Sequence, residues 1–207
     1  MRARLGILLA KQPVMLRAID LRNKPPEMLA ASPKGTVPVL VIDNAENLSQ
    51  ATVIDESLDI MLWALSLSDP DNLLYSDEPD QLPSMLSVIH RFDNEFKTHL
   101  DNYKSAKRYH EESKTEHRQQ CEAFIIELDQ RLSKHNYLMS DRPSLVDYAI
   151  LPYLRQFARV ERQWYTQAPY PHLQQWLKQH LTSALFSKSM INHPLWLDHQ
   201  QSFLIGE

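Results

Sequence analysis

The second half of the chain has the hydrophobic pattern of a helical bundle. Apolar residues recur there near the 3.6-residue period of amphipathic helices. The predicted helices cover residues 85–103, 111–134, 148–160 and 172–185. The third is apolar on nearly every side as far as Arg155, so we expect it at the centre of the bundle.

The first half has a different, mixed pattern. A helix over 1–12 is stopped by Pro13, and an apolar strand over 14–21 follows. A short helix is expected over 27–31 and a second long helix over 55–66. Between them, 37–42 and 49–54 read as strands of a hairpin, joined by the turn residues 43–47. This order is that of an α/β unit.

The segment 68–83 separates these halves. It contains three prolines and several aspartates, which favour a linker over a regular element. The sequence therefore predicts an α/β domain over 1–67, a linker over 68–83 and an all-helical domain over 84–207. A chain of 207 residues is long enough for two small domains of this size.

Composition narrows the class of protein. Apolar residues make up 43% and charged residues 23%, as is ordinary for a globular protein. Only 3 glycines stand against 13 prolines, which disfavours barrels with many turns and glycine-rich phosphate loops. The net charge is −4, and no basic stripe is interleaved with aromatic residues, so we expect no nucleic-acid partner.

Location is predicted from the cysteine count and the apolar runs. One cysteine, Cys121, leaves no intrachain disulfide and suits a reducing cytoplasm. The opening Met1–Ala10 superficially resembles a signal peptide, but its apolar core is short and no small-residue cleavage site follows. No apolar run has membrane-spanning length, so we expect a cytoplasmic protein without membrane contact.

The most informative stretch is Thr36–Leu40, an apolar run interrupted by Pro38. Proline cannot donate to a sheet ladder, so Pro38 fits a loop that enters a strand, with a cis bond before it. The main chain of Val37 is then left for a ligand. Downstream, Glu56 and Ser57 stand where a helix begins, a position suited to binding charge. Together these residues predict a site for a small peptide.

Several motifs in sequence order give the chain a family resemblance. A Val-Pro loop, a Glu-Ser helix start and an all-helical second domain resemble a cytosolic glutathione transferase. The later matching segments are Ser144–Asp147, which is also a capping-box pattern, and Tyr170–Leu177. Leu21–Pro25 is similar to the cysteine-type, omega-like branch, and 102–104 with 154–158 resembles bacterial members.

The resemblance implies a thioredoxin-like fold for the α/β domain and glutathione as co-substrate. Val37 would pair with the cysteinyl unit of glutathione and Pro38 would hold that loop. Glu56 would bind the γ-glutamyl ammonium, and Ser57 the adjacent carboxylate. Lys24 matches the position that reaches the glycyl carboxylate. The resemblance further implies a homodimer and a small electrophile or disulfide as acceptor.

Simpler interpretations stand beside these assignments. Glu56 and Ser57 are residue types that often only cap a helix. Lys24 is of a type usually solvated, and Lys34 is a second candidate cation on weaker grounds. Cys121 lies on an apolar helix stripe, so we expect it to be buried and inert. His110 and His117 lack a third ligand, so no metal site is predicted.

The resemblance also places a reactive Cys, Ser or Tyr upstream of Met1, at the end of a first strand. The chain as given lacks that strand, which would lie between the 14–21 strand and the hairpin, and no catalytic residue is assigned. Three interpretations are open: a misassigned start, a chain that binds without catalysing, or another strand that fills the gap. We expect a glutathione transferase-like protein, active in thiol transfer or conjugation if the N-terminus is restored. The alternative is a non-catalytic glutathione-binding or interaction module.

Overall fold

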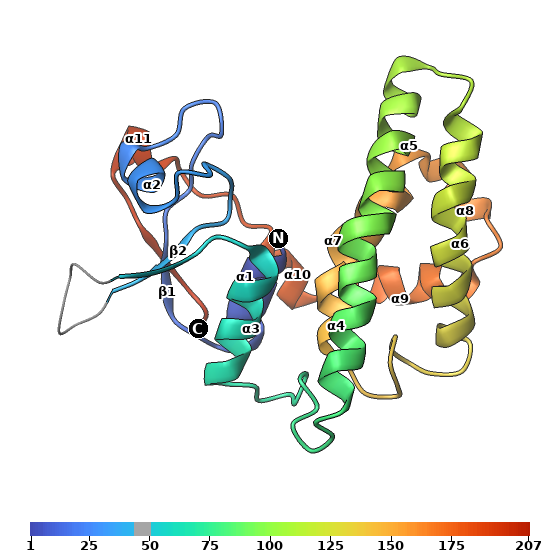
Figure 1. Ribbon diagram of the computed structural model, residues 1–207, viewed down its shortest axis with the longest axis horizontal. Coiled ribbons are helices and arrows are strands. Elements are labelled where there is room, and N and C mark those ends of the chain that lie inside the picture. Colours follow the sequence, from blue (N-terminus) through green and yellow to red (C-terminus); the bar gives the residue numbers. More distant parts are fainter. Residues whose placement is uncertain (44–50) are drawn as a thin grey trace. The chain divides into compact units, whose positions relative to one another are not determined.

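The computed structural model describes residues 1–43 and 51–207. Two compact units are present (Figure 1): unit 1 comprises Met1–Pro70 with Ala184–Glu207, and unit 2 comprises Asp71–Ser183. Unit 1 contains helices and short strands, whereas unit 2 is helical. The predicted combination of an α/β domain with an all-helical domain is therefore confirmed.

Unit 1 begins with the helix that the sequence predicts. Its elements are α1 (Arg2–Leu9), β1 (Val14–Leu16), α2 (Pro26–Ala31), β2 (Leu40–Ile42), β3 (Thr52–Ile54), α3 (Ser57–Leu67), α10 (Ala184–Ser189), α11 (Trp196–His199) and β4 (Phe203–Ile205). The strands are shorter than predicted. The turn residues expected over 44–47 and the strand start at 49 and 50 lie outside the described residues.

The core of unit 1 forms where α1 packs on α3. Leu5, Ile60 and Met61 are at most 1% exposed. Gly6 permits the close approach of the helices, because a Cβ at this position would lie 2.7 Å from the Cα of Met61. The apolar face predicted for 55–66 is thus buried against the N-terminal helix.

The predicted hairpin is confirmed. Strands β2 and β3 pair antiparallel, with Leu40 opposite Ile54 and Val41 opposite Val53. Since side chains alternate across a strand, Val41 and Val53 share one face, and both are exposed.

The partner of β1 was not predicted. It is β4, from the C-terminal segment of the same chain, which pairs antiparallel with Val14 opposite Ile205. The main-chain N–H of Trp196 also donates to the carbonyl of Ala18 at 2.7 Å. Strand β1 thus has a strand partner from the same chain, as the interpretation in which another strand fills the gap requires, although β4 does not pair with the hairpin in the described residues. Residues 184–207 join unit 1 rather than the helical domain predicted over 84–207.

Unit 2 contains helices over the segments predicted from the 3.6-residue period, and a further helix over 162–167 that was not predicted; the helix predicted over 172–185 ends at Leu181. The helices of unit 2 are α4 (Gln81–Arg91), a π-helical turn (Phe92–Phe96), α5 (Lys97–Tyr109), α6 (Lys114–Leu132), α7 (Leu145–Val160), α8 (Arg162–Gln167) and α9 (Pro171–Leu181). Figure 1 shows α5 and α6 running side by side. The rings of Phe92, Phe96 and Phe124 meet at centroid distances of 4.8 to 5.6 Å and fill the space between the helices.

The capping box predicted at Ser144–Asp147 is present at the start of α7. Both residues are fully buried. The Asp147 carboxylate accepts hydrogen bonds from the main chain of Leu138 at 2.9 Å and from Nε1 of Trp176 at 3.1 Å. This carboxylate therefore joins the start of α7 to α9 and to the preceding loop.

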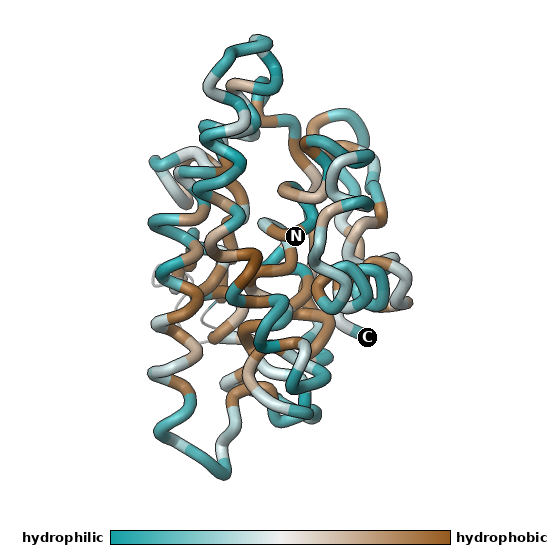
Figure 2. Tube along the Cα trace, turned by 90° about the vertical axis from the view of Figure 1, so that its right-hand side faces the viewer, coloured by the Kyte–Doolittle hydropathy of each residue, from teal (hydrophilic) through white to brown (hydrophobic). Residues whose placement is uncertain are grey.

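Apolar and polar segments recur turn by turn along the long helices (Figure 2), as expected for helices with one buried face. Within the described residues, none of the helices combines the length and the apolar character that a membrane span requires.

Candidate functional site

The candidate site forms where the loop after α2 meets the start of α3. The Oγ atom of Ser32 donates a hydrogen bond to Oδ2 of Asp55 at 2.7 Å. Ser32 is only 2% exposed, so this buried contact attaches the loop to the residue before Glu56. Sequence reasoning missed both residues, because a serine after a short helix and an aspartate before a long one are individually ordinary.

The loop presents the main chain of Val37 as predicted. The bond between Val37 and Pro38 is cis. Val37 is 48% exposed, and pairing with β3 begins only at Leu40. Within residues 1–43 and 51–207, the N–H and C=O of Val37 have no hydrogen-bond partner. An extended ligand could therefore pair with this residue.

Glu56 is positioned at the N-cap of α3, but its side chain does not cap the helix. Its carboxylate instead receives the Lys34 ammonium in an ion pair. The Glu56 side chain is 61% exposed, so its charge faces solvent. Simple helix capping therefore does not account for Glu56. Ser57 follows as the first residue of the helix and is half-buried.

Lys24 also reaches the loop. A Cβ at Gly35 would lie 3.2 Å from the Nζ atom of Lys24, which places the ammonium directly beside this glycine. Gly35 has a φ of +62°, in the left-handed region that glycine adopts readily. In the described part of the chain, the ammonium has no ion pair or hydrogen bond. It is thus available to an anionic ligand.

The charges around the loop are mixed. The hydrogen bond and charge of Glu56 raise the pKa of Lys34, and Asp55 and Asp59 act in the same direction. The site therefore combines two ammonium groups, a cluster of carboxylates and an unpaired peptide unit. Such a set suits a short extended peptide that carries charges of both signs.

The lone thiol lies elsewhere. Cys121 is fully buried in α6, and burial raises its pKa to about 12. A thiol of this kind is protonated near neutral pH and is a poor nucleophile. The expected buried position is confirmed. Among the described residues there is no group of three or more His, Cys, Asp or Glu side chains placed to hold a metal ion.

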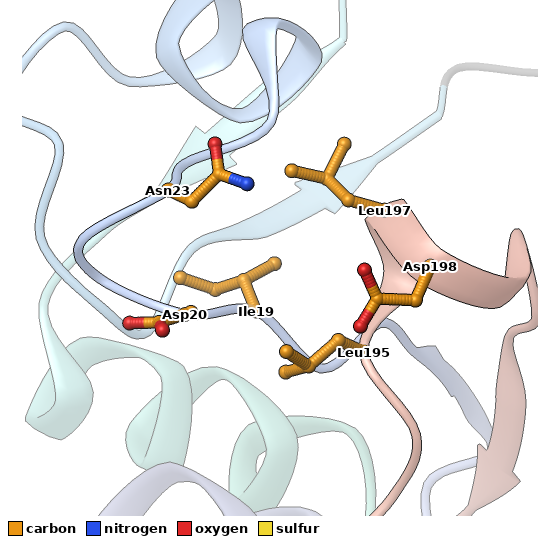
Figure 3. Close-up of a pocket in the computed structure, with 6 residues that line it drawn as sticks. All are labelled: Ile19, Asp20, Asn23, Leu195, Leu197 and Asp198. Atoms are coloured by element: carbon orange, nitrogen blue, oxygen red, sulfur yellow. The ribbon is translucent and has the colours of Figure 1, made fainter.

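A small pocket lies between the segment after β1 and the C-terminal segment (Figure 3). Ile19, Leu195 and Leu197 give it apolar walls. The Asp20 carboxylate points away from the other labelled side chains and pairs with Arg22 at 2.8 Å. Because the Asp20 charge is already paired, this pocket is a weaker candidate than the loop.

Fold and site together define a two-domain protein with a thioredoxin-like N-terminal unit. The sequence pattern of the glutathione S-transferase N-terminal domain matches residues 1–71, and that of the C-terminal domain matches residues 111–179. The chain belongs to the glutathione S-transferase family.

Solved structures agree with this fold. A glutathione S-transferase-I bound with lactoylglutathione aligns with a TM-score of 0.72 and 19% identity, over 91% of each chain. A family member from Pseudomonas fluorescens with two glutathiones bound aligns with a TM-score of 0.74 and 15% identity, over 90% of this chain and 86% of the other. A Burkholderia graminis transferase with two glutathiones per subunit aligns with a TM-score of 0.69 and 14% identity, over 90% of this chain and 82% of the other. No curated protein matches the chain in sequence.

Proposed function

We propose that the chain binds glutathione in unit 1. The observation that carries the proposal is the peptide unit of the exposed Val37, which has no partner in the described residues, on the loop whose Lys34 pairs with the exposed Glu56 carboxylate. Glutathione is an extended tripeptide with an ammonium and two carboxylates. Binding of glutathione by the related proteins from Pseudomonas fluorescens and Burkholderia graminis supports the assignment.

The cysteinyl main chain of the ligand and its three charged groups then have counterparts. Val37 pairs with the cysteinyl unit through its N–H and C=O, while Pro38 holds the loop. The Glu56 carboxylate accepts hydrogen bonds from the γ-glutamyl ammonium. Ser57, at the N-terminus of α3, donates to the neighbouring carboxylate, where the helix dipole favours negative charge. Lys24 binds the glycyl carboxylate.

The proposed reaction is thiol transfer or conjugation to a small electrophile or disulfide, in a cytoplasmic homodimer related to the bacterial omega-like branch. A reaction of the cysteine type needs a reactive protein thiol. Cys121 does not supply this thiol, because it is buried and burial raises its pKa. The second candidate function is a non-catalytic glutathione-binding or interaction module on the same fold, which requires no reactive thiol.

Isothermal titration of glutathione tests the binding proposal without relying on activity. Charge-assisted hydrogen bonds contribute about 1.5–3 kcal/mol each. Combined replacement of Glu56 and Ser57 by alanine should therefore weaken binding at least about tenfold. A matched control is Glu112→Gln with Ser68→Ala, which removes an exposed carboxylate in unit 2 and an exposed hydroxyl after α3. Equal affinities of the double variant and the control would contradict the site assignment.

Transfer of the glutathionyl group is measured separately, with a small disulfide and an aromatic electrophile as acceptors. Turnover that disappears in the Glu56 and Ser57 variant would favour the enzyme. Tight glutathione binding without turnover of either acceptor would favour the binding module.

A further inference from the structure

The ion pair between Lys34 and Glu56 joins two exposed side chains, which are 45% and 61% exposed. Neither charge is held in place by burial, so each can exchange its partner for water or a ligand. The pair nevertheless lies at the centre of the candidate site, because Glu56 is the carboxylate that the proposed function gives to the ligand ammonium. In this structure, that carboxylate already holds the ammonium of Lys34.

The backbone directs Lys34 toward Glu56. The N–H of Gly35 donates to the carbonyl of Ser32 at 3.0 Å, which closes a tight turn around Lys34. The Ser32 hydroxyl fixes this turn to Asp55, the residue that precedes Glu56. Lys34 is therefore carried by a turn that is attached to the start of α3, and its ammonium lies within reach of the same carboxylate.

The Lys34 side chain and the γ-glutamyl end of glutathione present the same chemical group to Glu56, a primary ammonium. A carboxylate can accept several hydrogen bonds, but two ammonium groups on one carboxylate repel each other. Asp55 and Asp59 strengthen the hold on any cation at this place. The two cations therefore compete, and binding of one favours release of the other.

Resting on the proposed function, we propose that Lys34 is an internal competitor for the ligand ammonium. It occupies Glu56 in the free protein and is displaced when a γ-glutamyl peptide binds. Lys34 is then a determinant of affinity and selectivity, since only ligands with a free ammonium regain the interaction that Lys34 gives up. This role is opposite to that of a cation that binds a ligand carboxylate.

A double-mutant cycle with glutathione tests the competition. An exposed ion pair contributes less than about 1 kcal/mol, which corresponds to at most about fivefold in affinity. Lys34→Gln should therefore tighten glutathione binding about two- to fivefold at low ionic strength. Glu56→Gln should weaken it, and Lys34→Gln should have no effect when Glu56→Gln is already present, because the contested carboxylate is gone.

Two controls isolate the ammonium. The first is a glutathione analogue in which the α-ammonium is replaced by hydrogen, glutaryl-cysteinylglycine, for which Lys34→Gln should give no gain. The second is Lys97→Gln, which breaks a comparable exposed ion pair with Asp101 in α5. This variant should leave glutathione affinity unchanged.

Other outcomes overturn the proposal in distinct ways. If Lys34→Gln weakens binding with and without Glu56→Gln, Lys34 binds a ligand carboxylate instead. If it changes nothing, the ion pair has no part in recognition. If none of the proteins binds glutathione, the proposed function itself is wrong and the competition fails with it. The ion pair is checked independently by NMR titration, in which Glu56→Gln should lower the pKa of the Lys34 ammonium.

Discussion

The two units use carboxylates in opposite ways. In unit 2, Asp147 is fully buried and its oxygens accept hydrogen bonds from Leu138, Ser144 and Trp176. In unit 1, Glu56 is largely exposed and pairs with the exposed Lys34. The Asp147 carboxylate connects elements of the fold, whereas the Glu56 carboxylate belongs to the candidate binding site.

The difference follows from the cost of losing a partner. A buried donor left without an acceptor costs about 1–3 kcal/mol, because water cannot replace the bond. An exposed ion pair contributes about 0–1 kcal/mol, because water and salt already compete with it. The bonds of Asp147 should therefore persist while the protein is folded. The bond of Glu56 is weak enough to exchange for a ligand.

The largest effect is expected from Asp147→Ala. This change leaves the N–H of Leu138, the indole N–H of Trp176 and the capping groups of Ser144 without their acceptor. We expect the free energy of unfolding to fall by about 3–5 kcal/mol, measured by urea denaturation.

Asp147→Asn is the matched control. It keeps the oxygen that accepts from Leu138 and Trp176 but places an NH₂ group against the donors of Ser144, so the loss should be smaller than with alanine. A loss below about 1 kcal/mol for Asp147→Ala would show that the buried network contributes little, and the contrast between the units would disappear.

A second, smaller effect concerns His180, which is 9% exposed and lies near Asp147. Burial lowers its pKa, while the Asp147 charge and the bond to the Trp176 carbonyl oppose this shift. The unfolded chain therefore binds a proton at a higher pH than the folded protein. The contribution of neutral His180 to the free energy of unfolding is complete above the pKa of the unfolded chain, near 6.5. It is lost as the pH falls from there toward the lower pKa of His180 in the folded protein.

Urea denaturation between pH 7.5 and 5 on the wild type and on His180→Asn measures this contribution. The difference between the two free energies of unfolding should change below pH 6.5 by at most about 1.4 kcal/mol per pH unit. Asparagine preserves a donor toward the Trp176 carbonyl but does not titrate. Parallel curves for the two proteins would show that His180 is not held neutral by burial.

The fold was largely predictable because its helices have strong periodic patterns. The apolar stripe of α6, with Cys121, Phe124 and Leu128, is buried as its spacing predicts. The capping box at Ser144 was also predictable, since its two side chains are three residues apart in the sequence. Local patterns determine such features, so no knowledge of distant contacts is needed.

The C-terminal strand was not predictable in the same way. Strand β4 has only three residues, and the pairing of Val14 with Ile205 joins opposite ends of the chain. No periodicity in a segment this short distinguishes a strand from a loop, and the sequence does not identify its distant partner.

The candidate site was predictable in part. Val37, Glu56 and Lys24 were found from the Val-Pro loop, the helix start and the family resemblance, and the structure places them around one loop. The ion pair of Lys34 was not foreseen, because it depends on how the turn at Gly35 directs a side chain. The contact between Ser32 and Asp55 was missed for the same reason.

The smallest predicted effect tests whether the hydrogen bond between Ser32 and Asp55 positions the candidate site. Ser32→Ala removes the 2.7 Å hydrogen bond to Asp55 and frees the loop that presents the main chain of Val37 to the ligand. A neutral hydrogen bond contributes about 0.5–1.5 kcal/mol, and a bond to a charged group somewhat more. We expect a stability loss of about 1 kcal/mol and a glutathione affinity about three- to tenfold weaker, measured by urea denaturation and calorimetry.

Two variants separate positioning from general destabilisation. Ser32→Thr keeps the hydroxyl and should retain most of the affinity. Ser66→Ala removes an exposed hydroxyl that bonds to the Trp63 carbonyl within α3, and it should leave glutathione binding unchanged. A Ser32→Ala protein that loses stability but binds glutathione as tightly as the wild type would show that the loop finds its conformation without Asp55. The exchangeable carboxylate of unit 1 would then depend on the ion pair between Lys34 and Glu56 and not on the hydrogen bond beneath the turn.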